Sequence, residues 1–202
     1  MTTVRLSRRS LGAVGALSGT VAALAGCGVS AAPGIEVQAA GAIDDLLAML
    51  GRHGLGGKTL EQVIDALDQD VRPRPLPLSV SVRSSEVVLS DTKGEVVAPL
   101  QSSHHYLAIA PFEVKTHECE FHDVGTCSGE LRDQPVHVTI TTSKGATLVD
   151  TDAVTYSNGF IGFWVPRNVK GTVRITCGSK WGQVAFSSDV KGATCLTNLQ
   201  IN

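Results

Sequence analysis

The sequence predicts an α+β fold in which a short N-terminal helical hairpin precedes a mainly antiparallel, β-sandwich-like domain. Two changes of pattern along the chain support this prediction. Between residues 43 and 67, apolar residues recur every three or four positions, which is typical of amphipathic helices. From Leu78 onward they recur at every second position, and glycine-containing turns separate the runs, which is typical of short antiparallel strands.

The helical hairpin is expected within residues 41–72. Its first apolar stripe follows the i, i+3, i+4, i+7 spacing, and glycines then end the helix. The second helix is expected to begin at Thr59-Leu60-Glu61-Gln62, a capping-box pattern in which the Thr59 hydroxyl accepts a hydrogen bond from the Gln62 N–H group. Each stripe needs a partner, so we expect the two helices to pack on each other and on the domain that follows. The stripes are Ile43, Leu46, Leu47 and Leu50, then Leu60, Val63, Ile64 and Leu67.

The β-rich domain is expected over residues 76–202, after a connector that Pro73, Pro75 and Pro77 stiffen. Turn signals such as Lys144-Gly145 separate the apolar runs. Many short strands at even spacing indicate a sandwich or a barrel. The predicted strands cover residues 78–82, 86–89, 106–110, 136–141, 160–165, 172–177, 183–186 and 195–201.

Residues 1–26 are typical of an export signal, with three arginines ahead of an apolar stretch. The stretch is shorter than the roughly 20 residues that a membrane-spanning helix needs. It ends in Leu24-Ala25-Gly26-Cys27, which resembles the bacterial lipobox, so we expect lipid attachment at Cys27; the alternative is an ordinary signal peptide that contains a cysteine. Ser7-Arg8-Arg9-Ser10-Leu11 also resembles a twin-arginine motif, which leaves the export route open. Residues 27–40 are rich in alanine and glycine and fit a flexible tether.

The chain is mildly acidic once the signal is removed. The signal carries three of the 17 basic residues and none of the 19 acidic ones, so 14 basic and 19 acidic residues remain, a net charge of −5. A nucleic-acid-binding protein needs a basic surface, so we expect no nucleic-acid partner. The expected location is the outer face of the cell membrane, in the periplasm or cell envelope, with the lipid as the only anchor.

Four cysteines remain after Cys27: Cys119, Cys127, Cys177 and Cys195. In an oxidising compartment they are first of all candidates for disulfide bonds. The surroundings of Cys119 indicate another use, because His117 lies two residues before it and Cys127 follows eight residues later. Thiolate and imidazole ligands favour copper(I) or zinc. A structural zinc finger would more often contain short Cys-x-x-Cys or His-x-x-x-His pairs, and this chain has none.

These segments resemble the CueP family of periplasmic copper-binding proteins, and the likeness extends over about residues 41–202. The resemblance implies copper binding in the cell envelope by Cys119, Cys127 and Cys195, and a role as a copper store or a chaperone that passes copper to a copper enzyme. Cys177 and the lipobox lie outside the family motif. The matching segments are Thr116-His117-Glu118-Cys119, Phe121-His122, Thr126-Cys127-Ser128-Gly129-Glu130-Leu131, Asn158-Gly159-Phe160-Ile161-Gly162, Trp164-Val165-Pro166-Arg167 and Thr194-Cys195-Leu196-Thr197-Asn198-Leu199-Gln200.

The other candidate residues are assigned from their context. His117 and His122 are candidate metal ligands, although a regular strand could not direct both inward because their positions have opposite parity. Cys177 is interpreted as a buried apolar residue or a disulfide partner, in preference to a fourth metal ligand. His104-His105 is expected in a polar loop, His53 and His137 on the surface, and Trp164 and Trp181 in packing contacts.

The leading hypothesis is a copper-binding protein, not an enzyme, that holds copper(I) through thiolates. Two thiols could also reduce copper(II) by closing to a disulfide. A copper-requiring envelope enzyme is the expected acceptor, and a homodimer is left open. The alternative is a disulfide-stapled β-sandwich that binds an envelope partner without metal. A thiol–disulfide oxidoreductase is disfavoured, because such enzymes usually carry a Cys-x-x-Cys pair at a helix N-terminus.

Overall fold

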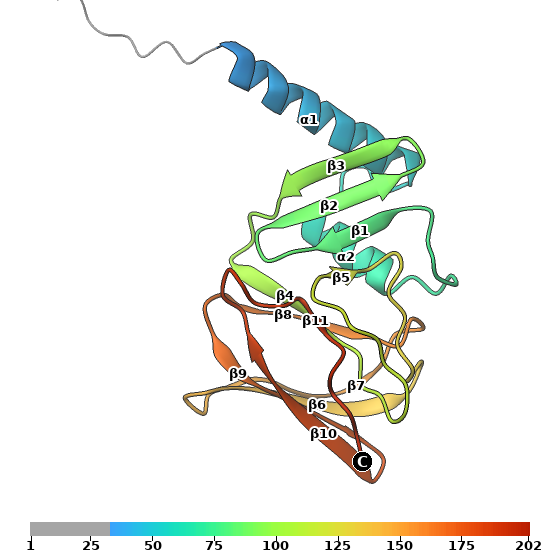
Figure 1. Cartoon of the computed structure of the whole chain (residues 1–202), viewed down its shortest axis with the longest axis vertical. Coiled ribbons are helices and arrows are strands. Elements are labelled where there is room, and N and C mark those ends of the chain that lie inside the picture. Colours follow the sequence, from blue (N-terminus) through green and yellow to red (C-terminus); the bar gives the residue numbers. More distant parts are fainter. Residues whose placement is uncertain (1–32) are drawn as a thin grey trace, which may run out of the picture.

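The structure, a computed structural model, describes residues 33–202, with side chains from residue 41 onward (Figure 1). The expected signal peptide and Cys27 lie outside the described residues. Within the described range the chain forms two helices and a series of short strands. They are α1 (Pro33–Arg52), α2 (Leu60–Asp68), β1 (Ser79–Val82), β2 (Glu86–Asp91), β3 (Gly94–Pro99), β4 (His104–Ile109), β5 (His122–Asp123), β6 (Pro135–Thr142), β7 (Thr147–Val154), β8 (Ile161–Pro166), β9 (Lys170–Cys177), β10 (Lys180–Ser187) and β11 (Cys195–Leu196).

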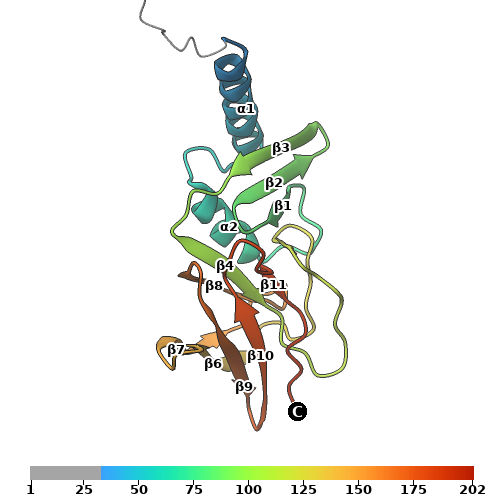
Figure 2. The same cartoon turned by 60° about the vertical axis from the view of Figure 1, so that its left-hand side comes forward.

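The predicted α+β class is confirmed, and the strands form three sheets. Their orders are β3-β2-β1-β5, β10-β9-β6-β7 and β11-β4-β8. All strand pairs are antiparallel except β11 with β4. The sheets follow one another along the long axis of the molecule, with β4, β8 and β11 in the middle (Figure 1 and Figure 2).

Strand β4 separates two hydrophobic cores. Because successive side chains of a strand point to opposite faces, Tyr106 and Ala108 pack with the helices and β1–β3, whereas Leu107 and Ile109 pack with β6, β8 and β9. All four residues are buried. A strand that is buried on both faces positions whatever is attached to it firmly, and β11, which begins at Cys195, pairs directly with it.

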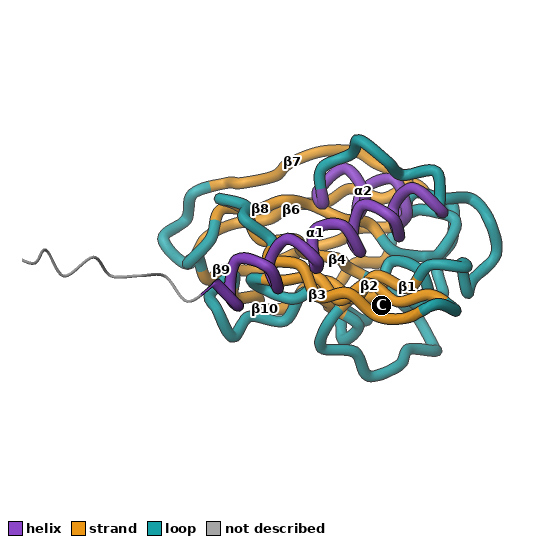
Figure 3. The backbone as a smooth tube through the Cα atoms, turned by 90° about the horizontal axis from the view of Figure 1, so that it is seen from above, coloured by secondary structure: helices purple, strands orange, loops and turns teal. Residues whose placement is uncertain are grey.

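The two helices lie at the same end of the molecule, over the strands (Figure 3). The capping box of α2 is confirmed: the Gln62 backbone N–H donates to the Thr59 hydroxyl at 3.3 Å, and the Thr59 N–H donates to the Gln62 side chain at 3.0 Å. Met49 and Leu50 of α1 share a core with Val63 of α2, so the expected contribution of both helices to one core is also confirmed.

Helix α1 differs from the expectation in two respects. It begins at Pro33, so residues 33–40 of the expected tether are helical. Its N-terminal half extends beyond β3 (Figure 1 and Figure 2), and Ile43 and Leu47 are more than half exposed, at 57% and 56%. The apolar stripe is therefore buried only toward its C-terminal end. No helix among the described residues is both long and apolar enough to span a membrane.

Candidate metal centre

The candidate ligands lie on two segments that meet beside β1. The first, between β4 and β6, is irregular except for β5, which pairs with β1 so that His122 faces Val82 and Asp123 faces Ser81. His117 and Cys119 precede β5, and Cys127 follows it. The second segment is β11, which begins at Cys195.

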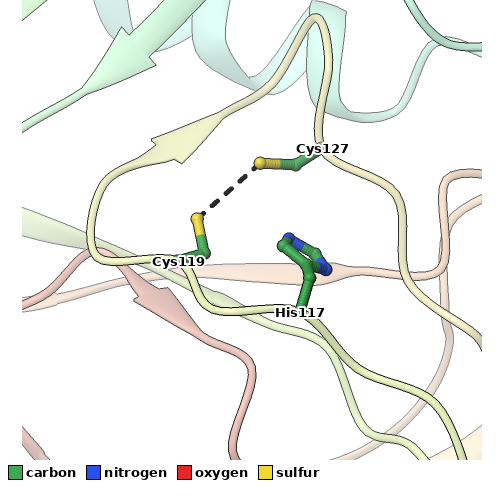
Figure 4. Close-up of side chains that lie close together, drawn as sticks. All are labelled: His117, Cys119 and Cys127. Atoms are coloured by element: carbon green, nitrogen blue, oxygen red, sulfur yellow. Dashed lines mark hydrogen bonds between the residues drawn. The ribbon is translucent and has the colours of Figure 1, made fainter.

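A tight turn after β5 directs Cys127 back toward Cys119. The Asp123 side chain accepts hydrogen bonds from the backbone N–H groups of Gly125 at 2.8 Å and Thr126 at 3.1 Å, and its carbonyl accepts one from Cys127 at 2.9 Å. The Sγ atoms of Cys119 and Cys127 lie 3.8 Å apart as a result, and their side chains point toward each other with the His117 ring beside them (Figure 4).

Hydrogen bonds join the second segment to the first. The backbone N–H groups of Thr194 and Cys195 donate to the Glu120 carbonyl at 3.0 and 3.2 Å. The Thr194 hydroxyl accepts the backbone N–H of His122 at 2.9 Å and donates to the Val82 carbonyl at 2.5 Å. This arrangement places Sγ of Cys195 at 3.8 Å from Nδ1 of His122.

The candidate ligands form two groups that share Cys127. In each group the ligand atoms all lie within 4.8 Å of one another. The outer group is His117, Cys119 and Cys127, in which His117 is exposed and both cysteines are half-buried. The inner group is His122, Cys127 and Cys195, in which His122 and Cys195 are buried. Each group offers one nitrogen and two sulfurs.

A buried network of polar side chains fixes the ring of His122. Its Nε2 lies 2.9 Å from Oδ1 of Asp68, which is the last residue of α2. Asp68 also accepts hydrogen bonds from the Tyr106 hydroxyl at 2.6 Å and from the Asn158 amide at 2.7 Å. A carboxylate that holds the far nitrogen of a histidine directs its near nitrogen at a metal, an arrangement common in metal sites.

Cys119, Cys127 and Cys195 form a sulfur cluster, and their electrostatics favour the thiolate form at Cys127. Hydrogen bonds from Cys119 and then Cys195 lower the pKa of the Cys127 thiol well below its usual value. The same contact with Cys127 raises the pKa of Cys119 to about 12, and contacts with Cys119 and Cys127 raise the pKa of Cys195. Burial alone would lower the pKa of His122, but the Asp68 carboxylate raises it to about 9. A thiolate is the form that binds a metal ion.

A surface pocket of about 590 Å³ opens beside the cluster. Cys119 and Cys195 are among its lining residues, and so are Glu118 and Glu120, which flank Cys119 in the chain. Both glutamates are exposed. The pocket therefore connects the sulfur cluster to solvent.

The structure brings together all five candidate ligands that the sequence suggested: His117, Cys119, His122, Cys127 and Cys195. The parity argument is resolved because His117 lies in an irregular segment and only His122 belongs to a strand. The sequence reasoning missed Asp68, Tyr106 and Asn158. One signal was available for Asp68: an acidic residue in the last turn of a helix is unfavourable with the helix dipole, which indicates another reason for its presence.

The four cysteines of the described range are free thiols. The Cys119–Cys127 sulfur distance of 3.8 Å is well beyond the length of a disulfide bond, which is about 2.05 Å. No disulfide bond therefore cross-links the described residues. Cys177 lies outside both groups, half-buried at the end of β9, where it packs against the core of β6, β8 and β9.

The other histidine and tryptophan assignments can also be compared with the structure. His104 and His105 are not in a loop: both belong to β4, where His104 is exposed and His105 is only 1% exposed. Trp181 is 45% exposed beneath the Arg174 guanidinium, whereas Trp164 packs against the core and donates a hydrogen bond to Asp65 at 2.9 Å. His137 is exposed, as expected.

His53 lies 3.0 Å from Asp91 and is only partly exposed. It joins the C-terminal end of α1 to the turn between β2 and β3.

Comparison with known proteins gives a consistent assignment. The family model of the periplasmic copper-binding protein CueP matches residues 62–200. The crystal structure of S.CueP superimposes with a TM-score of 0.74 and 42% sequence identity, over 77% of this chain and 96% of that one. A search of curated proteins found no match. The chain belongs to the CueP family of periplasmic copper-binding proteins.

Proposed function

We propose that this protein holds copper(I) through the thiolates of Cys119, Cys127 and Cys195, with His117 and His122 as nitrogen ligands. The observation that carries the proposal is the convergence of these five side chains in two groups that share Cys127. Sulfur and imidazole are soft ligands that suit copper(I), whereas carboxylate-rich sites suit harder ions.

The test is a titration of the reduced protein with copper(I) against a competing chelator. The variant in which Cys119, Cys127 and Cys195 are all replaced by serine should lose copper(I) binding. Cys177→Ser is the matched control, because Cys177 belongs to neither group, and it should bind as the parent protein does. Unchanged binding by the triple variant, or a preference for zinc over copper(I) in the same competition, would contradict the proposal.

Reduction of copper(II) is a second part of the proposal. Closing one disulfide releases two electrons and two protons from two thiols, so it can convert two copper(II) ions to copper(I). The close approach of the three thiols supports this step. Anaerobic addition of copper(II) should then consume two free thiols for every two copper(I) ions formed. Formation of copper(I) without loss of thiols would contradict it.

The cellular role that we propose is a copper store or chaperone held at the outer face of the membrane by a lipid on Cys27, with a copper-requiring envelope enzyme as the acceptor. The lipobox-like Leu24-Ala25-Gly26-Cys27 supports the anchor. In cell fractions the parent protein should follow the membrane, and Cys27→Ala should not. A parent protein found free in the periplasmic fraction would refute the anchor but not copper binding.

A homodimer is also part of the proposal, and the exposure of the apolar residues Ile43 and Leu47 on α1 supports it. Light scattering should then give twice the mass of one chain. Replacement of both residues by serine should shift the protein toward the monomer. A parent protein that is monomeric at micromolar concentration would overturn this part.

A further inference from the structure

We propose that the cluster provides two copper positions joined by Cys127, an outer position for exchange with solvent or partners and an inner position for retention. The inference rests on the proposed function. The outer position is formed by His117, Cys119 and Cys127, and the inner one by His122, Cys127 and Cys195. Copper(I) is satisfied by two or three soft ligands, so each group of one nitrogen and two sulfurs is a complete site.

The two positions differ in their access to solvent. His122 is fully buried and Cys195 is 3% exposed, so the inner position is enclosed by protein on its nitrogen side and on one sulfur. In the outer position His117 is exposed and Cys119 is half-buried. Cys119 and Cys195 both line the pocket, but Cys195 is the more deeply buried of the two. An incoming copper complex, or a partner that removes copper, meets the outer ligands first.

They also differ in how firmly their ligands are held. The His122 ring is fixed by Asp68 at 2.9 Å, and its backbone N–H by Thr194. Cys195 is fixed by β11, which pairs with the buried strand β4. By contrast, His117 and Cys119 lie in the irregular segment that precedes β5. Pre-organised ligands bind more tightly because less motion is lost on binding, so the inner position should fill first at equilibrium.

Movement between the positions needs no release of copper. Cys127 remains bound throughout while the Cu–S bond to Cys119 breaks and one to Cys195 forms. His122 replaces His117 in the same way. The thiol proton of Cys195 passes to Cys119 as the two sulfurs exchange, and a proton that leaves Nδ1 of His122 passes to solvent. Copper stays in the copper(I) state, so protons and electrons balance without another reactant.

Thiol protection in the reduced protein tests the two positions directly. Copper(I) is added without oxygen, at one equivalent or in excess, iodoacetamide then labels the thiols, and mass spectrometry measures each labelling rate. With one equivalent we expect the labelling of Cys127 to slow by about tenfold or more, while Cys119 keeps nearly its metal-free rate. In excess copper(I), Cys119 should become protected as well. Cys177 is the internal control, since it belongs to neither group.

A variant sharpens the test. In Cys195→Ser the inner position loses a sulfur, so the first equivalent of copper(I) should bind at the outer position instead. It should then slow the iodoacetamide labelling of both Cys119 and Cys127. Equal protection of Cys119 and Cys127 by the first equivalent in the parent protein would overturn the two-position proposal while leaving copper binding intact. Protection of no thiol at all would overturn the proposed function itself, and this proposal with it.

Discussion

The Nε2 atom of His122 lies 2.9 Å from Oδ1 of Asp68, and neither side chain is exposed to solvent. Asp68 ends α2, whereas His122 begins β5, so this contact joins the helical part of the protein to the sulfur cluster. Two further groups, the Tyr106 hydroxyl and the Asn158 amide, donate hydrogen bonds to the same carboxylate. The orientation of a candidate metal ligand, His122, therefore depends on residues that are far from it in the sequence.

Asp68→Asn should weaken both the fold and copper binding. The variant leaves the buried His122 without its counter-charge, and removal of one partner of a buried pair typically costs about 3–5 kcal/mol of unfolding free energy. Loss of a residue that orients a metal-bound histidine typically lowers metal affinity by about 10–100-fold. Urea denaturation and copper(I) competition measure the two effects.

Asp70→Asn is the control for that variant, because Asp70 is two residues away and forms an ion pair with Arg72 at the surface. Such pairs contribute less than about 1 kcal/mol. Unchanged copper affinity in Asp68→Asn would show that Asp68 does not position His122 as a ligand.

Tyr106→Phe should have a smaller effect on the same network. It removes one hydrogen bond, at 2.6 Å, but leaves the charge pair of Asp68 and His122 in place. Hydrogen bonds to charged groups contribute about 1.5–3 kcal/mol, so the unfolding free energy should fall by about that amount. Copper affinity should fall less than in Asp68→Asn. A larger loss of copper affinity than in Asp68→Asn would mean that Tyr106, rather than the carboxylate, controls the ring.

The sequence predicts most elements whose side chains alternate between core and solvent, but it misses β3 and β7. Strands β3 and β7 are edge strands, and most of their side chains are exposed or only partly buried, so their pattern lacks a clear apolar face. The apolar stripe of α1 misleads in the opposite way, because its residues Ile43 and Leu47 are more than half exposed although they are apolar.

The residues that gather at the candidate site are predictable from the sequence, but their geometry is not. Residue types and spacing around Cys119 indicate soft-metal chemistry, but the approach of Cys195 depends on the parallel pairing of β11 with β4, which no local pattern specifies. The division of five ligands into two groups that share Cys127 likewise follows from the tertiary fold. The polarity of His105 predicts a loop and hides its position in a central strand.

His105 should make the protein less stable as the pH falls below about 6.5. Burial lowers the pKa of His105, which stays neutral in the fold and takes up a proton only on unfolding. Its Nε2 lies 3.2 Å from the Ala193 carbonyl, and of the charged groups that act on it, Arg167 opposes protonation while Asp189 favours it. Because the folded-state pKa is lowered, the unfolding free energy keeps its full value above the unfolded-state pKa of about 6.5. Below that pH it falls by up to about 1.4 kcal/mol per pH unit.

The measurement for His105 is the unfolding free energy from urea denaturation between about pH 5 and pH 7.5. His105→Gln keeps a donor for Ala193 but cannot be protonated, so its stability should fall less steeply toward low pH. His104→Gln is the matched control on the exposed neighbour and should follow the parent. Identical pH profiles of His105→Gln and the parent protein would contradict the prediction.

Gly159→Ala should be more damaging than Gly145→Ala, although both glycines have a positive φ, +84° and +85°. The left-handed backbone costs a non-glycine residue about 1–2 kcal/mol at either position. A Cβ at Gly145 would meet nothing within 4 Å, whereas one at Gly159 would lie 2.5 Å from the Gly129 carbonyl oxygen. Such a contact forces backbone atoms apart, and overpacking adds about 1–3 kcal/mol.

The Gly159 contact also bears on copper, because Gly129 is only two residues after Cys127. Its N–H donates to the Asn158 carbonyl at 2.6 Å, so a displaced Gly159 moves the segment that carries the shared sulfur. Gly159→Ala should therefore lower copper(I) affinity in the chelator competition, and Gly145→Ala, in the distant turn between β6 and β7, should not. Equal losses of stability in the two variants would show that the backbone near Gly129 yields to the added methyl group. In that case the Cys127 segment would be held less tightly than the close backbone contact implies.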